Sequence, residues 1–188
     1  MSREKTVWMA TGNCHKYREA RAVLQQFSVD LRHLKVERVE IQADDLAEIA
    51  AYSAMQVDAR GRPVVVEDAG LFIDHYAGFP GPYSSYALRT IGLDGVLKLM
   101  EHIEERGASF QSAVALRDGD KTRCFRGSVQ GRIAHSIRGT GGFGYDPIFI
   151  PDEGDGRTFG EMAAEEKNTL SHRARAFRNL GGWLSSSS

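Results

Sequence analysis

The chain has 188 residues, with 24 Lys and Arg against 25 Asp and Glu, so its formal net charge at pH 7 is −1. Proteins that coat DNA or RNA depend on a large basic excess, and this balance excludes that class. The longest apolar runs have only a few residues, far short of the roughly 20 that cross a bilayer, so no membrane association is expected. The first residues, 1–6, lack the apolar core of a signal peptide, so we expect a cytoplasmic protein. The length of the chain is typical of one domain.

Glycine and cysteine are the two informative residue types in the composition. The chain has 20 Gly but only 5 Pro, and this glycine content exceeds the usual value of about 7%. Its two cysteines, Cys14 and Cys124, have neither CxxC spacing nor a neighbouring Cys/His cluster. In a reducing compartment we expect both to be free thiols.

The first third of the chain predicts alternating strands and helices. A strand at 7–10 ends in a tight loop, and from Lys16 apolar residues recur with helical spacing up to Phe27. Apolar alternation at 34–41 slips by one position, which predicts a strand with a bulge or bend. Asp45 is placed to cap a helix up to about Val57.

The remaining elements are expected in a fixed order. These are a buried strand at 63–66, an acidic turn at 67–70, a rigid loop at 78–83, helices at 83–90 and 94–105, an antiparallel meander of strands at 110–116, 123–126 and 129–134, a Gly-rich loop at 138–145, a short strand at 147–150, and a last helix opened by Ser171. This mixture predicts an α/β protein with a mixed β-sheet flanked by helices. Residues 1–184 form one domain in this interpretation, and 185–188 form a disordered polar tail.

Thr11, Gly12 and Asn13 lie between the first strand and the first helix, and Lys16 follows in the first helical turn. Free backbone N–H groups, a helix N-terminus and a positive side chain suit a phosphate group. The segment is not a P-loop, because GxxxxGK[ST] is absent. An ordinary tight turn with Asn13 in a left-handed conformation is the alternative.

Acidic side chains follow two of the predicted strands, Glu40 after the bent strand and Glu67 with Asp68 after the buried strand. Ligands gather at strand ends in α/β sheets, and carboxylates there suit Mg²⁺ or the activation of a water molecule. The alternatives are turn capping by Glu67 and Asp68, and a solvated strand position for Glu40.

The segment 138–146 holds four glycines, two aromatic residues and an acid. Phe143 or Tyr145 could stack on a planar base, and Asp146 could accept a hydrogen bond from a base N–H. Alternatively, either ring anchors the loop to the core.

Four basic residues and no acidic one lie between Lys167 and Arg178. His172 and Arg173 could donate to a carbonyl oxygen of a base, and Lys167 could contact phosphate or base. A solvated basic helix face is the alternative.

Taken together, these segments resemble the inosine triphosphate pyrophosphatase family, from Thr11 to about Arg173. The motifs that carry the resemblance are TGNxxKxxE at 11–19, EIQ at 40–42, EDAGL at 67–71, FPGPYSSY at 79–86, FRG at 125–127, GFGYDPIF at 142–149 and FGEMAAEEKNTLSHR at 159–173. One such motif would be weak support, whereas seven in the family's order are very specific.

The resemblance implies an elongated α/β fold with a mixed sheet, two lobes and a central cleft, usually in a homodimer. It also implies Mg²⁺-dependent hydrolysis of ITP, dITP or XTP at the α–β phosphoanhydride, which yields the monophosphate and pyrophosphate and clears damaged nucleotides from the pool. Two alternatives stay open: a Maf-like pyrophosphatase for pyrimidine or modified nucleotides, and a nucleotide sensor without catalysis. The complete SHR and FGYD segments weigh against the first, and Glu40 with Asp68 against the second.

Roles carried over by position divide the predicted site into three parts. The triphosphate would be bound by Thr11, Gly12, Asn13, Lys16 and the backbone of Ala69. Glu40 and Asp68 would bind Mg²⁺, and Asp68 would also accept the proton of the attacking water. The base pocket would consist of Phe143, Gly144, Tyr145, Asp146, Lys167, His172 and Arg173.

Two departures from the family pattern stand out. Ser53 and Ser85 occupy positions where many members carry a lysine near the phosphates, and Tyr145 stands where a Trp is common. Fewer positive charges would raise KM or leave more of the phosphate binding to Lys16, Mg²⁺ and arginines that the motifs do not identify.

Overall fold

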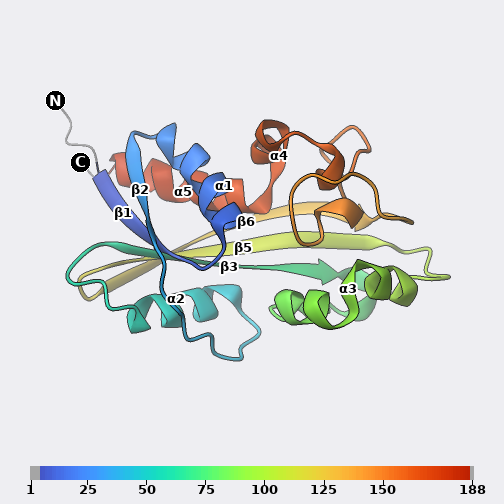
Figure 1. Cartoon of the computed structure of the whole chain (residues 1–188), viewed down its shortest axis with the longest axis horizontal. Coiled ribbons are helices and arrows are strands. Elements are labelled where there is room, and N and C mark those ends of the chain that lie inside the picture. Colours follow the sequence, from blue (N-terminus) through green and yellow to red (C-terminus); the bar gives the residue numbers. More distant parts are fainter. Residues whose placement is uncertain (1–4, 187–188) are drawn as a thin grey trace. The chain divides into compact units, whose positions relative to one another are not determined.

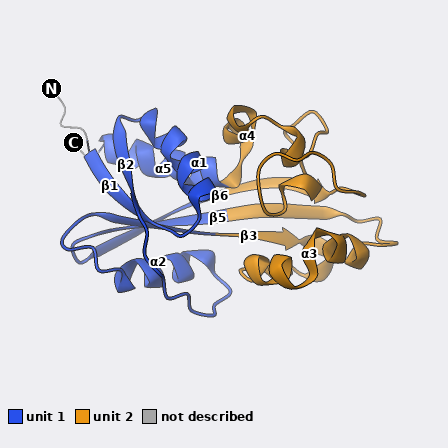
Figure 2. Ribbon diagram, in the orientation of Figure 1, with its two compact units in different colours: residues 1–68, 112–127, 173–188 blue, residues 69–111, 128–172 orange. Residues whose placement is uncertain are grey.

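The computed structural model describes residues 5–186 and divides into two compact units, coloured separately in Figure 2. Unit 1 consists of residues 1–68, 112–127 and 173–188, and unit 2 of residues 69–111 and 128–172. None of the helices in the described part of the chain has the length and apolar character needed to cross a membrane.

A mixed β-sheet is the central feature of the fold (Figure 1). Within the described residues its seven strands are β1 (Lys5–Ala10), β2 (Val29–Leu34), β3 (Val64–Ile73), β4 (Pro80–Gly81), β5 (Gly107–Asp118), β6 (Lys121–Ile133) and β7 (Phe149–Pro151). They are ordered β2-β1-β3-β5-β6-β7, and β4 pairs with β3. β1 is parallel to β2 and β3, whereas the pairs β3–β4 and β6–β7 are antiparallel. The predicted α/β class with a mixed sheet is therefore confirmed.

The longer helices are α1 (Cys14–Gln25), α2 (Leu46–Gln56), α3 (Ser84–Leu99), α4 (Ala164–Leu170) and α5 (His172–Ser186). In unit 1, α1 and α5 cover one face of the sheet and α2 covers the other (Figure 1). Strand alternation explains the two cores, because Val65 faces α1 and α5 while Val64 and Val66 face α2.

Side-chain caps start the first two helices. Asn13 Oδ1 accepts hydrogen bonds from the backbone N–H groups of His15 and Lys16, and Asp45 accepts one from Ala47. Such caps satisfy helix donors that have no partner within the helix. The predicted cap at Asp45 is confirmed.

Unit 2 has an aromatic and aliphatic core of its own. Phe110, Phe149 and Phe159 pack against one another, with ring centroids 4.6–6.3 Å apart. The helical pair predicted at 83–90 and 94–105 is present within α3, where two helices meet at a kink at Gly92 with φ +67°. The second helix ends at Leu99, earlier than predicted.

Several predicted boundaries are wrong. The strand expected at 34–41 ends at Leu34, and residues 35–45 form neither helix nor strand. β3 continues through the expected turn at 67–70, since its last residues pair with β4. The meander is a hairpin, because β6 runs unbroken over the two strands expected at 123–126 and 129–134.

The predicted tail also differs from the structure. Ser185 and Ser186 belong to α5, where the Ser185 hydroxyl donates to the Gly181 carbonyl at 3.0 Å. Ser187 and Ser188 lie outside the described residues.

Candidate active site

The loop at residues 11–13 is held by short polar contacts within unit 1. The Thr11 backbone N–H donates to the Leu34 carbonyl, and the Thr11 hydroxyl accepts from Asn13 N–H at 3.1 Å. His33 Nε2 lies 2.8 Å from the Thr11 carbonyl oxygen, while Gly12 is exposed. Asn13 has φ −96°, so the alternative of a left-handed Asn turn is wrong. The loop therefore leads into α1 with a capped, pre-formed N-terminus.

Lys16 is part of a buried ion cluster that joins distant parts of the sequence. Its ammonium lies 2.9 Å from Glu67 Oε2, and the Glu67 side chain is fully buried. Glu67 Oε1 accepts from the Ser112 hydroxyl at 2.9 Å and from Arg173 Nε at 3.0 Å. Arg173 Nη1 also donates to Glu19 at 2.6 Å. The sequence suggested acids and bases at these positions but did not show their partners.

Asp68, next to Glu67 on β3, is half-buried, and its pKa is raised from the ordinary 3.8 to about 6. Burial is the largest cause, and the charge of Lys16 opposes it. The negative charges of Glu67 and Glu40 raise this pKa further, whereas Arg38 lowers it. A carboxylate that titrates near neutrality is suited to accept a proton from water.

Glu40 lies in the irregular segment between β2 and α2, not at a strand end as predicted. It is exposed and forms an ion pair with Arg38 at 2.5 Å, while Arg38 also donates to the Glu67 carbonyl oxygen. Ser53 on α2 is fully buried and donates to the Val39 carbonyl at 2.5 Å. The serine at this position therefore fixes the segment that carries Glu40.

The donor set places a limit on metal binding. The described residues contain no group of three or more His, Cys, Asp or Glu side chains suited to hold a metal ion. Mg²⁺, however, is often bound through one or two carboxylates, with water and substrate phosphates completing its shell. Glu40 and Asp68, close enough for the charge of one to raise the pKa of the other, fit a site of that kind.

A second cluster of predicted residues lies in unit 2 around the Gly-rich loop. Asp146 is buried, and its Oδ2 accepts from the Phe143 backbone N–H at 2.7 Å and from Lys167 Nζ at 2.6 Å. The Lys167 ammonium lies 4.7 Å from the centre of the Phe143 ring. Because Lys167 is 3% exposed, the alternative of a solvated basic face is wrong for this residue.

The loop geometry depends on glycine at two positions in particular. Gly139 has φ +80°, and a Cβ there would collide with the Gly160 backbone. Gly142 has φ +68°, and a Cβ there would collide with the Asp146 carboxylate. Gly144 also has a positive φ of +67°.

Ala69, which is predicted to contact the triphosphate through its backbone, is a half-buried residue of β3.

The two aromatic residues of the loop differ in their surroundings. Tyr145 is 4% exposed and belongs to the core of unit 2, where its hydroxyl donates to the Ser84 carbonyl at 2.7 Å. Burial raises the pKa of Tyr145 to about 12. Phe143 is only half-buried. The structure therefore favours Phe143 as a stacking ring, with Tyr145 anchoring the loop.

His172 and Arg173 start α5 but belong to different units. In unit 2, the His172 ring stacks on Phe110 with centroids 4.5 Å apart and planes 10° from parallel. The structure thus groups Thr11, Gly12, Asn13, Lys16, Asp68 and Arg173 in unit 1, with Glu40 beside Arg38. It groups Ala69, Phe143, Gly144, Tyr145, Asp146, Lys167 and His172 in unit 2.

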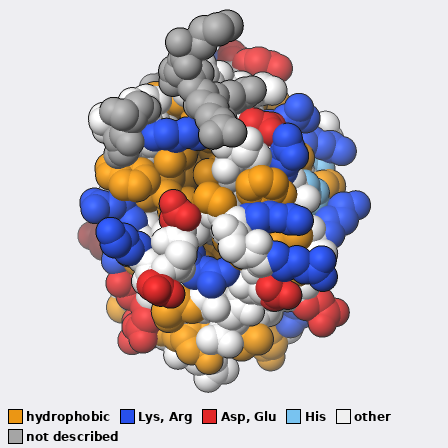
Figure 3. Space-filling model, turned by 90° about the vertical axis from the view of Figure 1, so that its left-hand side faces the viewer, with side chains coloured by type: hydrophobic (Ala, Val, Ile, Leu, Met, Phe, Trp, Pro, Cys, Tyr) orange, Lys and Arg blue, Asp and Glu red, His pale blue; other side chains and the backbone are white. Residues whose placement is uncertain are grey.

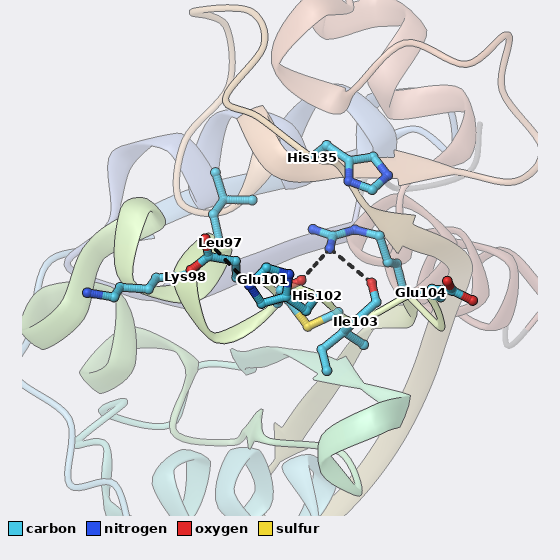
Figure 4. Close-up of a pocket in the computed structure, with 9 residues that line it drawn as sticks. Leu97, Lys98, Glu101, His102, Ile103, Glu104 and His135 are labelled. Atoms are coloured by element: carbon cyan, nitrogen blue, oxygen red, sulfur yellow. Dashed lines mark hydrogen bonds and ion pairs between the residues drawn. The ribbon is translucent and has the colours of Figure 1, made fainter.

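A separate hollow in unit 2, with a volume of about 750 Å³, is shown in Figure 4. Its lining includes His102, His135 and the buried Arg106. Arg106 donates to the carbonyls of Met100, Ile103, Ile133 and Ala134, so it joins the end of α3 to β6. None of the predicted site residues lines this hollow.

The surface charge agrees with the composition. Lys and Arg side chains occur at both edges of the face shown in Figure 3, and Asp and Glu side chains also occur on that face, with hydrophobic side chains between them. This face therefore lacks the uniform positive charge of a nucleic-acid coat.

The fold and the two clusters define a mixed-sheet α/β protein that combines a buried Lys–Glu–Arg network with a carboxylate that titrates near neutrality. The chain belongs to the Ham1 family, whose model matches residues 7–183. It is similar to a dITP/XTP pyrophosphatase of Hyperthermus butylicus, with 48% identity over 96% of this chain and 95% of that protein. A dITP/XTP pyrophosphatase of Pyrobaculum aerophilum is 50% identical over 94% of each chain.

Solved structures of the family have the same fold. A HAM1 protein from Coxiella burnetii matches with a TM-score of 0.85 at 28% identity, covering 97% of this chain and 99% of that one. The Staphylococcus aureus Ham1 protein matches with a TM-score of 0.83 at 25% identity, covering 98% and 100%.

Proposed function

We propose that the protein hydrolyses non-standard purine nucleoside triphosphates (dITP, ITP and XTP) to the monophosphate and pyrophosphate. Relatives named dITP/XTP pyrophosphatase support this substrate class, since they share 48–50% sequence identity with this protein over almost the whole chain. The observation that carries the proposal is Asp68, whose pKa of about 6 suits a proton acceptor, in the same unit as Lys16 and the capped α1 N-terminus.

The triphosphate is assigned to the loop at 11–13 and to Lys16. A helix N-terminus and an ammonium group both favour a phosphate oxygen. The Lys16 ammonium is the main donor in this assignment, because the backbone N–H groups of Asn13, His15 and Lys16 already donate within the protein. Ala69 would add its backbone N–H from the residue after Asp68. Because Ser53 and Ser85 provide no positive charge, Lys16 is the main cation in this assignment.

In the proposed reaction, Asp68 activates the attacking water. Asp68 accepts a proton from a water molecule whose oxygen attacks the α-phosphorus. The bond from the α-phosphorus to the α–β bridging oxygen then breaks, and pyrophosphate leaves with the electron pair. Glu40 and Asp68 would hold Mg²⁺, which supplies neutralisation of phosphate charge when bound.

The base is assigned to unit 2. Hypoxanthine and xanthine carry a C6 carbonyl where adenine carries an amino group, so a pocket of donors discriminates against ATP. A site built to hydrogen-bond a substrate group can reach roughly 10⁴–10⁵-fold discrimination. The proposed donors in unit 2 are His172 and Lys167, whose ammonium lies 4.7 Å from the centre of the half-buried Phe143 ring.

Arg173 as a base donor stays a prediction, because its guanidinium donates to Glu19 and Glu67. If Arg173→Ala leaves the ratio of kcat/KM for ITP to kcat/KM for ATP unchanged, Arg173 does not read the base.

We also propose that the enzyme acts in the cytoplasm as a homodimer, which follows from the family resemblance. Light scattering of the purified protein tests the oligomer, and a mass of one chain would contradict it.

Pyrophosphate release from XTP and dITP, with Mg²⁺ and with EDTA, tests the proposed function. Release that needs Mg²⁺ and is specific for these purines supports it. Preference for dUTP or modified pyrimidines would support the Maf-like alternative, and tight binding without release would support a sensor.

A further inference from the structure

Glu67 has no role in the proposed reaction, yet it is the most enclosed charged side chain among the described residues of unit 1, at 0% side-chain exposure. We propose that Glu67 is a positioning residue, whose carboxylate fixes the Lys16 ammonium and the Arg173 guanidinium without touching substrate or metal. This inference rests on the proposed function, because Lys16 is the residue assigned to the triphosphate.

The contacts of Glu67 divide between its two oxygens. Oε2 faces Lys16 of α1 at 2.9 Å, whereas Oε1 accepts from Arg173 of α5 at 3.0 Å and from Ser112 of β5 at 2.9 Å. Residues of four elements (α1, β3, β5 and α5), all within unit 1, therefore meet at one carboxylate. A change at Glu67 would disturb several predicted site segments at once.

The side chains of the neighbouring residues Glu67 and Asp68 lie on opposite faces of the sheet. Consecutive side chains of a strand point to opposite faces of the sheet, so Glu67 follows Val65 toward α1 and α5. Asp68 follows Val66 toward the face that α2 covers. The two neighbouring acids therefore have different environments, one enclosed by cations and one half-buried, and Asp68 is the residue suited to chemistry.

The charges of the cluster explain why a carboxylate is needed. Lys16 and Arg173 are two cations held in one unit, where Glu67 contacts both and Glu19 contacts Arg173. A lysine side chain has four flexible methylene groups, so an ion pair with a buried partner narrows the positions of its ammonium. Glu67 would thus preset Lys16 for a phosphate oxygen before substrate binds.

The substitution Glu67→Gln tests this role, because glutamine has the same shape but no charge. Its amide NH₂ would face donors of Lys16 or Arg173, and Lys16 would lose its fixed position. A misplacement of about 1 Å can cost ~10²-fold in rate, and we expect a loss of kcat/KM for XTP of that order. Glu67→Asp keeps the charge and should recover part of the activity. Glu105→Gln, an exposed acid in unit 2, is the matched control.

A double-mutant cycle distinguishes positioning from direct action. If Glu67 acts through Lys16, Glu67→Gln should lose most of its effect in a Lys16→Met background, because the positioned group is already absent. If the two losses multiply instead, Glu67 does not act through Lys16, and the proposed positioning of Lys16 is wrong.

A measurement independent of turnover separates this inference from the proposed function. In ¹⁵N-lysine NMR spectra, the Lys16 ammonium should give a protected signal in the wild type and in Glu105→Gln, but not in Glu67→Gln. A signal that persists in Glu67→Gln overturns the inference even if the enzyme hydrolyses XTP. Absence of XTP hydrolysis by the wild type would overturn the proposed function alone. If Glu67→Gln does not fold, Ser112→Ala and Glu67→Asp replace it in the NMR experiment. Both variants keep the carboxylate charge but change its position, so each should shift the Lys16 ammonium signal relative to the wild type.

Discussion

Replacing Asp68 by asparagine should make the metal-free protein more stable at pH 8 while abolishing hydrolysis. Burial is the main reason that the pKa of Asp68 lies near 6 instead of 3.8. The unfolded chain therefore releases this proton near pH 4, and the folded chain near pH 6. Between these values the folded state binds more protons, so the stability present below pH 4 is lost as the pH rises through 6.

The size of this loss follows from the shift. At about 1.4 kcal/mol per pKa unit, a shift of roughly two units costs up to about 3 kcal/mol above pH 6. Asparagine carries no charge and avoids this cost. For a chain of this length we expect a rise in Tm of up to about 6–12 °C at pH 8.

Thermal unfolding in EDTA at pH 5 and pH 8 tests this reasoning. The gain in Tm for Asp68→Asn over the wild type should be largest at pH 8 and about half as large at pH 5, because at pH 5 Asp68 is still mostly protonated in the folded chain but already ionised in the unfolded chain. Glu105→Gln, an exposed acid, should show no comparable gain at either pH. An equal gain at both values, or a loss of stability at pH 8, would refute the argument. Near-normal turnover by Asp68→Asn would exclude Asp68 as the proton acceptor.

Three further predictions concern the buried pair in unit 2, the loop aromatic and the metal. Lys167→Met leaves the buried Asp146 carboxylate without its lysine, so the free energy of unfolding in urea should fall by about 3–5 kcal/mol, and a loss below 1 kcal/mol would contradict the role of this pair. Tyr145→Phe removes the hydrogen bond to Ser84 and should cost ~1 kcal/mol of stability without changing the XTP-to-ATP preference, whereas a changed preference would mean that Tyr145 contacts the base. EDTA should stop pyrophosphate release and added Mg²⁺ should restore it, whereas turnover in EDTA would exclude a metal at Glu40 and Asp68.

Local signals in the sequence predicted much of the fold. The helical spacing after Lys16, the cap at Asp45 and the helix after Ser171 all depend on residues close together in the chain, and the structure confirms them. The extent of β3 depends on distant residues. Glu67 can remain in a buried strand because Lys16, Arg173 and Ser112 enclose it, and no pattern within a few residues reveals those partners.

The segment before α2 shows a different limit. Apolar residues at 34–41 alternate as in a strand, but the chain leaves the sheet at Leu34, and Val39 is exposed. The segment is tied instead by the Ser53 hydroxyl, an interaction that alternation cannot encode.

The candidate site was predictable as residue types but not as an arrangement. The aromatic pair in the Gly-rich loop is an example, because both rings look equally suited to stacking in the sequence. Only packing separates them: Tyr145 lies in the core of unit 2 and Phe143 is half-buried beside Lys167. Similarly, the sequence placed Arg173 among possible base donors, whereas its contacts with Glu19 and Glu67 depend on the folded unit 1.

The most direct test of the account is pyrophosphate release by the wild-type protein with Mg²⁺ over a panel of XTP, ITP, dITP, GTP, ATP and dUTP. The account predicts monophosphate and pyrophosphate as products, with kcat/KM for XTP and dITP above that for ATP by roughly 10⁴-fold, as expected when donors face a C6 carbonyl. Absence of pyrophosphate from every purine triphosphate, or equal kcat/KM for ATP and XTP, would contradict it.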